Sequence, residues 1–184
     1  MFENISILYI INKDNNTDTN KYINALSAKI ITEHTDLDNE ALLSMADNLN
    51  ISFNNTFDSL QLYKSNLLIK TVFNNSLLID DNIVSKFNYN DDLLYFLIDL
   101  VAFIKNIDYD KEASPNIIYC NDKVLIYKYK DIYFLHNFND LAMKIELPEE
   151  LQYKDFYSVF CNSDKHLKDS FILGKHNFYV LERI

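Results

Sequence analysis

The chain has 184 residues, of which 48% are hydrophobic, and this is enough for one real core or for two small packed halves. Its net charge of −10 and its lack of a basic stripe argue against nucleic acid and anionic membranes as partners, because both repel an acidic protein. Gly174 is the only glycine, which excludes the glycine-rich loops that bring the backbone close to a phosphate.

The first part of the chain alternates apolar runs with helical patterns. Ile5 to Ile11 is a compact, isoleucine-rich run that predicts a buried strand. Lys21 to Leu26 favour a short helix, and Ala28 to Thr32 favour a second strand, although that run is also compatible with a helix. Apolar residues recur at helical spacing from Asp38 to Leu49, which predicts an amphipathic helix.

Two further helices are predicted on either side of a short strand. The first runs from Phe57 to Phe73, with Thr56 as a candidate N-cap. The strand is the apolar run Leu77 to Ile79. The second helix has a wide apolar stripe from Asp91 to Ile107, and Asn90 can cap its exposed N–H groups.

The pattern changes to short β-rich runs after Ser114-Pro115, because a residue before proline is pushed out of the helical region. Short turn-like pairs separate these runs, which favours an antiparallel meander or sandwich. The predicted strands are Asn116–Cys120, Lys123–Lys128, Ile132–Phe138, Ala142–Leu147, Phe156–Phe160, Phe171–Leu173 and Asn177–Glu182. We therefore predict an α+β chain, with a helical part over residues 1–112 and an antiparallel β-domain over residues 113–184.

Four pieces of the β-region occur in a characteristic order after a long helix. They are Val124 to Tyr127, Phe134 to Asn139, Lys144 to Pro148 and Phe178 to Glu182. Their order and spacing resemble the C-terminal β-domain of α-amylase-type glycoside hydrolases, glycoside hydrolase family 13. The resemblance implies that the helical part is a partial β/α barrel-like segment. It also implies that the β-sandwich-like C-terminal domain does no chemistry, because in that family the domain is non-catalytic.

The resemblance is weaker in the residues that precede the β-region. Glu33-His34-Thr35-Asp36 lies about where the family places its Asn-His-Asp motif, whose His and Asp hold substrate hydroxyls. The resemblance therefore implies His34 and Asp36 as sugar contacts, although Thr35 separates them here. The segment Ile79 to Asn82 stands where the family has a Tyr-Gly-Glu-Glu-like sequence.

Length argues against catalysis by this chain alone. Glycoside hydrolysis needs two carboxyl groups that flank the scissile bond. The resemblance places them on the fourth and fifth barrel strands, which would lie upstream of Met1. A complete (β/α)8 barrel needs about 200–250 residues. We therefore assign no catalytic residue and expect no hydrolysis by the isolated chain.

Three tyrosines offer a second candidate sugar site. Tyr127, Tyr129 and Tyr133 alternate along adjacent predicted strands, so they could share one face and stack against a sugar. The alternative is that they fill the core or cover another subunit, because aromatic residues are abundant throughout the chain.

Other chemistry has weaker support in the sequence. Cys120 and Cys161 lack C-x-x-C spacing and lie in apolar surroundings, so we expect buried free thiols and neither a disulfide nor a metal site. Cys161 with His166 or His176 could form a nucleophile–base pair, but no glycine elbow accompanies them. Asp80-Asp81 is better explained by helix capping or solvation than by a cation. No cofactor is predicted.

These observations lead to one leading hypothesis and two alternatives. The leading hypothesis is a non-catalytic relic or accessory protein related to amylase-type glycosidases, which binds carbohydrate or protein. The alternatives are one piece of a split or oligomeric α-glucosidase or amylase, and a structural protein–protein interaction module. Uncovered apolar strand edges would favour a homo-oligomer or a protein partner in all three cases. The absence of a recognisable signal peptide or apolar span of membrane length leads us to expect a soluble, cytoplasmic protein.

Overall fold

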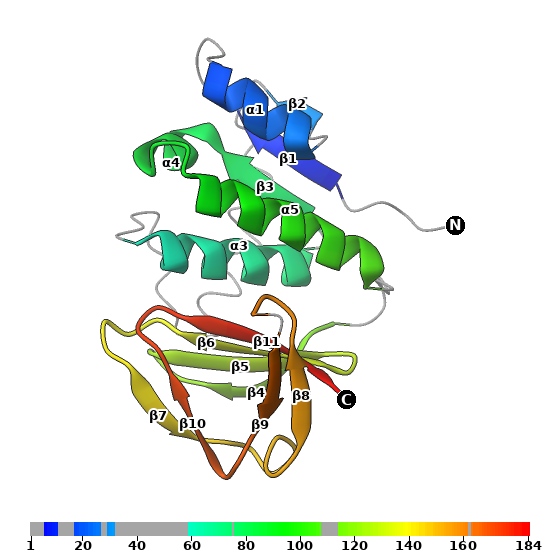
Figure 1. Ribbon diagram of the computed structural model, residues 1–184, viewed down its shortest axis with the longest axis vertical. Coiled ribbons are helices and arrows are strands. Elements are labelled where there is room, and N and C mark those ends of the chain that lie inside the picture. Colours follow the sequence, from blue (N-terminus) through cyan, green and yellow to red (C-terminus); the bar gives the residue numbers. More distant parts are fainter. Residues whose placement is uncertain are drawn as a thin grey trace. The chain divides into compact units, whose positions relative to one another are not determined.

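The computed structural model describes residues 6–10, 17–26, 29–31, 59–74, 76–107, 114–161 and 163–184. The chain divides into two compact units (Figure 1). The described residues of the first unit are those up to Ile31 and those from Asn66 to Ile107, and the second unit contains Ser59–Ser65 and the residues from Ser114 onward. The predicted α+β fold class is confirmed. The predicted helix from Asp38 to Leu49 and the candidate cap Thr56 lie outside the described residues.

The first unit contains a three-stranded parallel sheet with the order β2-β1-β3. Its strands are β1 (Ser6–Ile10), β2 (Lys29–Ile31) and β3 (Ser76–Asp80), all close to the predicted positions. Helix α1 (Thr17–Leu26) connects β1 to β2. In a (β/α)8 barrel each strand lies between its neighbours in sequence. Because β1 lies between β2 and β3, this sheet has βαβ connections but departs from the strand order of a barrel segment.

Three further helices lie among the described residues of this part of the chain. Helix α3 (Leu60–Asn74) begins in the second unit and continues into the first, and α5 (Asp91–Asn106) begins where the Asn90 side chain accepts the Asp92 N–H, as predicted. One face of α5 is buried, with Leu93, Leu94, Phe96, Leu97, Leu100, Val101 and Ile104. The short helix α4 (Asp81–Lys86) was not predicted, because six residues are too few to show a helical period. None of these described helices is long and apolar enough to cross a bilayer.

The second unit is an antiparallel β-domain. Six strands form a sheet with the order β4-β5-β6-β11-β8-β9, and two more form the separate pair β10-β7 (Figure 1). The strands are β4 (Asn116–Cys120), β5 (Val124–Tyr129), β6 (Ile132–Asn137), β7 (Met143–Glu146), β8 (Asp155–Ser158), β9 (Ser163–His166), β10 (Ser170–Leu173) and β11 (Phe178–Arg183). Strand β9 was not predicted, because its sequence Ser-Asp-Lys-His contains no apolar residue.

The core of this domain lies between the two sheets. It contains side chains of β5, β6, β8 and β11 from the large sheet and of β7 and β10 from the pair, so the predicted sandwich-like packing is confirmed. The cluster consists of Val124, Ile126, Tyr133, Leu135, Ile145, Leu147, Leu151, Phe156, Leu167, Leu173 and Leu181. The ring of Phe156 meets the ring of Tyr133 edge to face, with 5.6 Å between the centroids.

The cysteines differ from the prediction in their burial. Both thiols are free, as expected, but Cys161 is exposed and Cys120 is only partly buried. Cys161 lies in the turn after β8, and Cys120 ends an edge strand. Partial burial raises the pKa of the Cys120 thiol, because the thiolate loses solvation.

Candidate functional site

The predicted tyrosine platform does not form as a single surface. In the register of β5 and β6, Tyr127 faces Phe134, whereas Tyr133 faces Lys128 and therefore points to the opposite side of the sheet. The prediction that the three tyrosines share one face is wrong for Tyr133. Its ring belongs to the core between the sheets, and alternation along β5 places Tyr129 on the side of Tyr127.

The same tyrosines are also buried. Tyr127, Tyr129 and Tyr133 are 0%, 1% and 4% exposed, so they fill the interior, which was the alternative considered from the sequence. The Tyr127 ring stacks on Phe134 with 4.6 Å between the centroids. Burial raises the pKa of the Tyr127 hydroxyl well above its ordinary value, because a phenolate would lose its solvation. The other two predicted sugar contacts, His34 and Asp36, lie outside the described residues.

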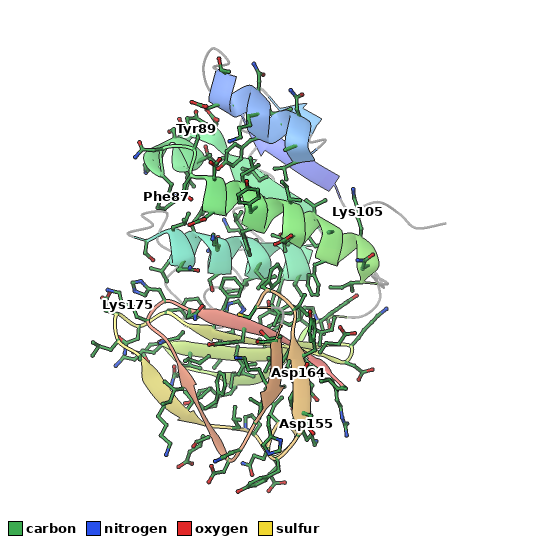
Figure 2. The ribbon with its side chains drawn as sticks, in the orientation of Figure 1. Phe87, Tyr89, Lys105, Asp155, Asp164 and Lys175 are labelled. Carbon is green, nitrogen blue, oxygen red and sulfur yellow. The ribbon has the colours of Figure 1, made fainter. Side chains whose placement is uncertain are left out.

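A polar cluster lies at the carboxyl end of the parallel sheet in the first unit. Strand β3 ends at Asp80, whose side chain caps α4 by accepting the Asn82 N–H at 2.9 Å. The next residue, Asp81, accepts a hydrogen bond from Thr19 Oγ1 on α1 at 3.0 Å. Tyr89, which lies in the turn after α4 (Figure 2), donates its hydroxyl to both Asp81 oxygens at 3.3 and 3.2 Å. We call Thr19, Asp81 and Tyr89 the Asp81 cluster.

Packing between α1 and the start of α5 holds this cluster in place. The Tyr22 hydroxyl, on a fully buried side chain, donates to the Asn90 carbonyl at 2.6 Å. The Tyr22 ring meets the Tyr89 ring edge to face at 6.0 Å, which fixes the direction of the Tyr89 side chain. Burial, and then the nearby Asp91, raise the pKa of the Tyr22 hydroxyl, so it remains a hydrogen-bond donor.

An exposed ion pair lies beside this packing. Lys21 Nζ is 2.5 Å from Asp91 Oδ1, and this hydrogen bond raises the pKa of Lys21. Both side chains are more than half exposed, so the pair adds little to stability.

The Asp81 cluster is suited to binding hydroxyl groups. Its carboxylate accepts hydrogen bonds, and its two hydroxyls can each donate or accept. Thr19 is buried, whereas Asp81 and Tyr89 are partly exposed, so the latter two are accessible to a ligand. Within the described ranges, no group of three His, Cys, Asp or Glu side chains could hold a metal ion.

The sequence identified only part of this cluster. Asp80-Asp81 was recognised at the end of a strand and assigned to capping, and the structure confirms capping for Asp80. Thr19 and Tyr89 were missed because they are 62 and 8 residues from Asp81 and belong to no motif. The position of Asp81 just after a predicted strand was the one available signal, since ligands bind at the carboxyl ends of parallel strands.

The histidines of the second unit have partners other than the predicted cysteine. His166 Nδ1 lies 2.7 Å from Asp155 Oδ1, and His176 contacts Ser59 and Asp140. The Cys161–His pair considered from the sequence is therefore not among the contacts of the described residues. His136 is fully buried, and burial lowers the pKa of its imidazole to about 3, so it is a neutral structural side chain at ordinary pH.

Comparison with known proteins shows that this chain is similar to some of them in fold. No family model matches the sequence, and no curated protein matches it. An α-amylase from Malbranchea cinnamomea superposes with a TM-score of 0.58 and 13% identity, over 77% of this chain and 41% of the amylase. A structure of AmyP in complex with maltotriose gives a TM-score of 0.55 and 9% identity, over 67% of this chain and 34% of AmyP.

A third similar structure is a protein from Bacteroides fragilis assigned as an α-galactosidase. Its TM-score is 0.51 and its identity 18%, over 68% of this chain and 29% of that protein. The chain thus spans less than half the length of each of these proteins. The resemblance to amylase-type glycoside hydrolases is confirmed as a similarity of fold to part of such an enzyme.

Proposed function

We propose that this chain is an accessory relative of amylase-type glycosidases, which binds an α-linked oligosaccharide at the Asp81 cluster without hydrolysing it. The observation that carries the proposal is the position of Asp81 at the carboxyl end of β3, hydrogen-bonded to Thr19 and Tyr89. Parallel α/β folds bind ligands at this end of the sheet. The similarity to an α-amylase fold and to AmyP bound to maltotriose supports an α-linked glucose oligomer as the ligand class.

The chemistry of the cluster fits sugar hydroxyls. An ionised Asp81 carboxylate can accept hydrogen bonds from two hydroxyls of one sugar unit, and the Tyr89 hydroxyl can serve a third. The neighbouring Tyr22 ring and α1 hold Tyr89 in place, so little side-chain freedom is lost on binding.

The hydrogen bonds of the Asp80 and Asp81 carboxylates support binding without hydrolysis. A glycosidase needs one carboxylate as nucleophile or base and another as acid, on opposite sides of the scissile bond. Asp80 is engaged as the cap of α4, and Asp81 accepts hydrogen bonds from Thr19 and Tyr89. These contacts suit fixed acceptors better than an attacking group.

A titration with maltotriose up to about 10 mM, followed by amide chemical shifts, tests this proposal. We expect saturable shifts at Thr19, Asp81 and Tyr89. Asp81→Asn should weaken binding at least about tenfold, because a charged acceptor is lost. The exposed Asp99 on α5 gives a matched control, since Asp99→Asn makes the same chemical change away from the cluster and should leave the affinity unchanged.

Three results would count against the proposal. Equal weakening by Asp81→Asn and Asp99→Asn would show that net charge, and not the cluster, attracts the sugar. Release of glucose from maltotriose by the purified chain would overturn binding without glycoside hydrolysis, in favour of a split or oligomeric glycosidase. No binding, combined with a tight homodimer in sedimentation, would leave a protein interaction module.

A further inference from the structure

Three side chains of the second unit form a continuous hydrogen-bonded relay. Ser59 Oγ lies 3.0 Å from His176 Nδ1, and His176 Nε2 lies 3.0 Å from Asp140 Oδ1. Lys175 Nζ is 3.2 Å from the same Asp140 oxygen. The three residues come from the start of α3, the turn before β11 and the loop after β6, so only the fold brings them together.

The direction of the proton donors in this relay can be deduced. The Leu62 N–H donates to Ser59 Oγ at 3.2 Å, and the Asp140 carboxylate at Nε2 can only accept, so Nδ1 of a neutral His176 is the acceptor for the Ser59 hydroxyl proton. A neutral His176 then carries its ring proton on Nε2 and donates it to Asp140. This is the proton order of a serine nucleophile, a histidine base and an orienting carboxylate, with the roles of Nδ1 and Nε2 exchanged relative to the Ser-His-Asp triad.

The surroundings of Ser59 add two further elements of such a site. Ser59 directly precedes the 15-residue helix α3. The Leu62 N–H is used by Ser59 Oγ, whereas the N–H groups of Leu60 and Gln61 have no acceptor within the helix and carry partial positive charge. These groups can stabilise a developing oxyanion. Ser59 is also partly exposed, which allows a small substrate to approach.

A second serine–histidine pair in the same unit provides an internal contrast. Ser65 Oγ lies 2.5 Å from His136 Nδ1, but both residues are 0% exposed. No substrate can reach Ser65, and its hydrogen bond to histidine is explained by the need to satisfy buried polar groups. Ser59 differs from Ser65 in two ways. It is partly exposed, and its partner His176 also contacts the Asp140 carboxylate.

We propose that Ser59, His176 and Asp140 form an esterase-type site for short-chain carboxylic esters. Ser59 Oγ attacks the ester carbonyl carbon, and its proton moves to His176 Nδ1. The tetrahedral intermediate collapses, and the leaving alcohol takes that proton. Water then attacks the acyl-serine with His176 again as base, which releases the carboxylic acid and restores Ser59. Asp140 acts as a positioning residue, because it orients the imidazole and does not touch the substrate.

A fluorophosphonate probe on the full chain tests the site, with the modified peptide identified by mass spectrometry. We expect the label on Ser59 and none on Ser65. Hydrolysis of p-nitrophenyl acetate should fall to background in Ser59→Ala. This comparison is necessary because the exposed Cys161 thiol can also react with the ester.

Variants of Asp140 separate a positioning role from a structural one. Asp140→Asn should lower the labelling rate at least about tenfold, and Asp140→Glu should restore most of it. Because the Asp140 side chain is 79% exposed, neither change should move the unfolding midpoint appreciably. An unlabelled Ser59 in the folded wild-type chain would overturn the proposal, as would equal labelling of wild type and Asp140→Asn. Sugar binding in the first unit involves none of these residues, so either proposal can fail without the other.

Discussion

Ser65 Oγ lies 2.5 Å from His136 Nδ1, and both side chains are completely buried. The histidine ring stacks on Tyr127, Phe138 and Phe178, with 5.5, 6.0 and 6.0 Å between the centroids. An imidazole enclosed by aromatic rings cannot be solvated when it is charged, which is why its pKa falls to about 3. This pair links Ser65 on α3 to His136 on β6, so both residues should contribute to the stability of the fold.

The first prediction concerns acid sensitivity. The folded-state pKa of His136 is depressed below the ordinary value of 6.5, so the unfolded chain binds a proton that the folded chain does not. The stability associated with the neutral imidazole is present above pH 6.5 and is lost as the pH falls from 6.5 toward about 3. The loss should approach about 1.4 kcal/mol per pH unit in that window.

Replacing His136 by glutamine isolates this contribution, because glutamine keeps a polar group near Ser65 but does not titrate. Urea unfolding between pH 7 and pH 4.5 should give a shallower pH dependence for His136→Gln than for wild type. Parallel curves for the two proteins would mean that His136 is not buried as a neutral base.

The second prediction compares two buried serines. Ser65→Ala leaves His136 Nδ1 without its partner and should lower the free energy of unfolding by about 1–3 kcal/mol. Ser158 is also fully buried, but within the described part of the chain its Oγ has no hydrogen-bond partner. Ser158→Ala should therefore be neutral or stabilising in the same urea titration. If both variants lose equal stability, the hydrogen bond to His136 is not what makes Ser65 important.

The third prediction concerns Asn137, the last residue of β6. Its Nδ2 lies 2.9, 3.2 and 2.8 Å from the carbonyl oxygens of Leu141, Leu173 and Gly174, and it joins two loops of the β-domain. Asn137→Asp replaces this donor with a charged acceptor that faces those carbonyls, so it should cost more than about 3 kcal/mol. Asn116→Asp makes the same change on an exposed strand and should stay within about 0.5 kcal/mol. Similar unfolding midpoints for the two variants would contradict this role.

The fourth prediction concerns the start of α5. The Asn90 side chain accepts the Asp92 N–H at 2.7 Å, so Asn90→Ala should destabilise the first unit by about 1 kcal/mol. Asn90→Asp keeps the acceptor and should recover most of the loss. Hydrogen exchange of the α5 amides in the three proteins measures the effect locally. Unchanged exchange in Asn90→Ala would show that the cap is not needed.

Local sequence patterns were sufficient to predict most of the individual helices and strands. The apolar stripe between Asp91 and Ile107 predicted α5, and the alternation after Ser114-Pro115 predicted seven of the eight strands of the β-domain. These patterns work because a helix or a strand must bury one face, and the period of the apolar residues reports which of the two it is. Strand β9 and helix α4 were missed because one has no apolar residue and the other is too short to show a period.

Contacts between residues far apart in the sequence could not be predicted from local patterns. The expected single face for Tyr127, Tyr129 and Tyr133 depended on the register of β5 against β6, and that register places Tyr133 opposite Lys128. A shift of one residue would have reversed the result, because side chains alternate between the two faces of a strand. The prediction that Cys161 is buried was wrong for a similar reason, since an apolar sequence context does not show whether other residues cover a turn.

By itself, the sequence determined the α+β class, the change from helices to strands near Ser114-Pro115, and a resemblance that the fold comparison confirmed. Only the tertiary structure decided the strand order β2-β1-β3, the Asp81 cluster and the relay from Ser59 through His176 to Asp140. The physical reason is that secondary structure follows from short-range periodicity and capping. A site depends on which distant side chains the packing of sheets and helices brings within hydrogen-bonding distance, and in this chain those side chains lie in no common motif.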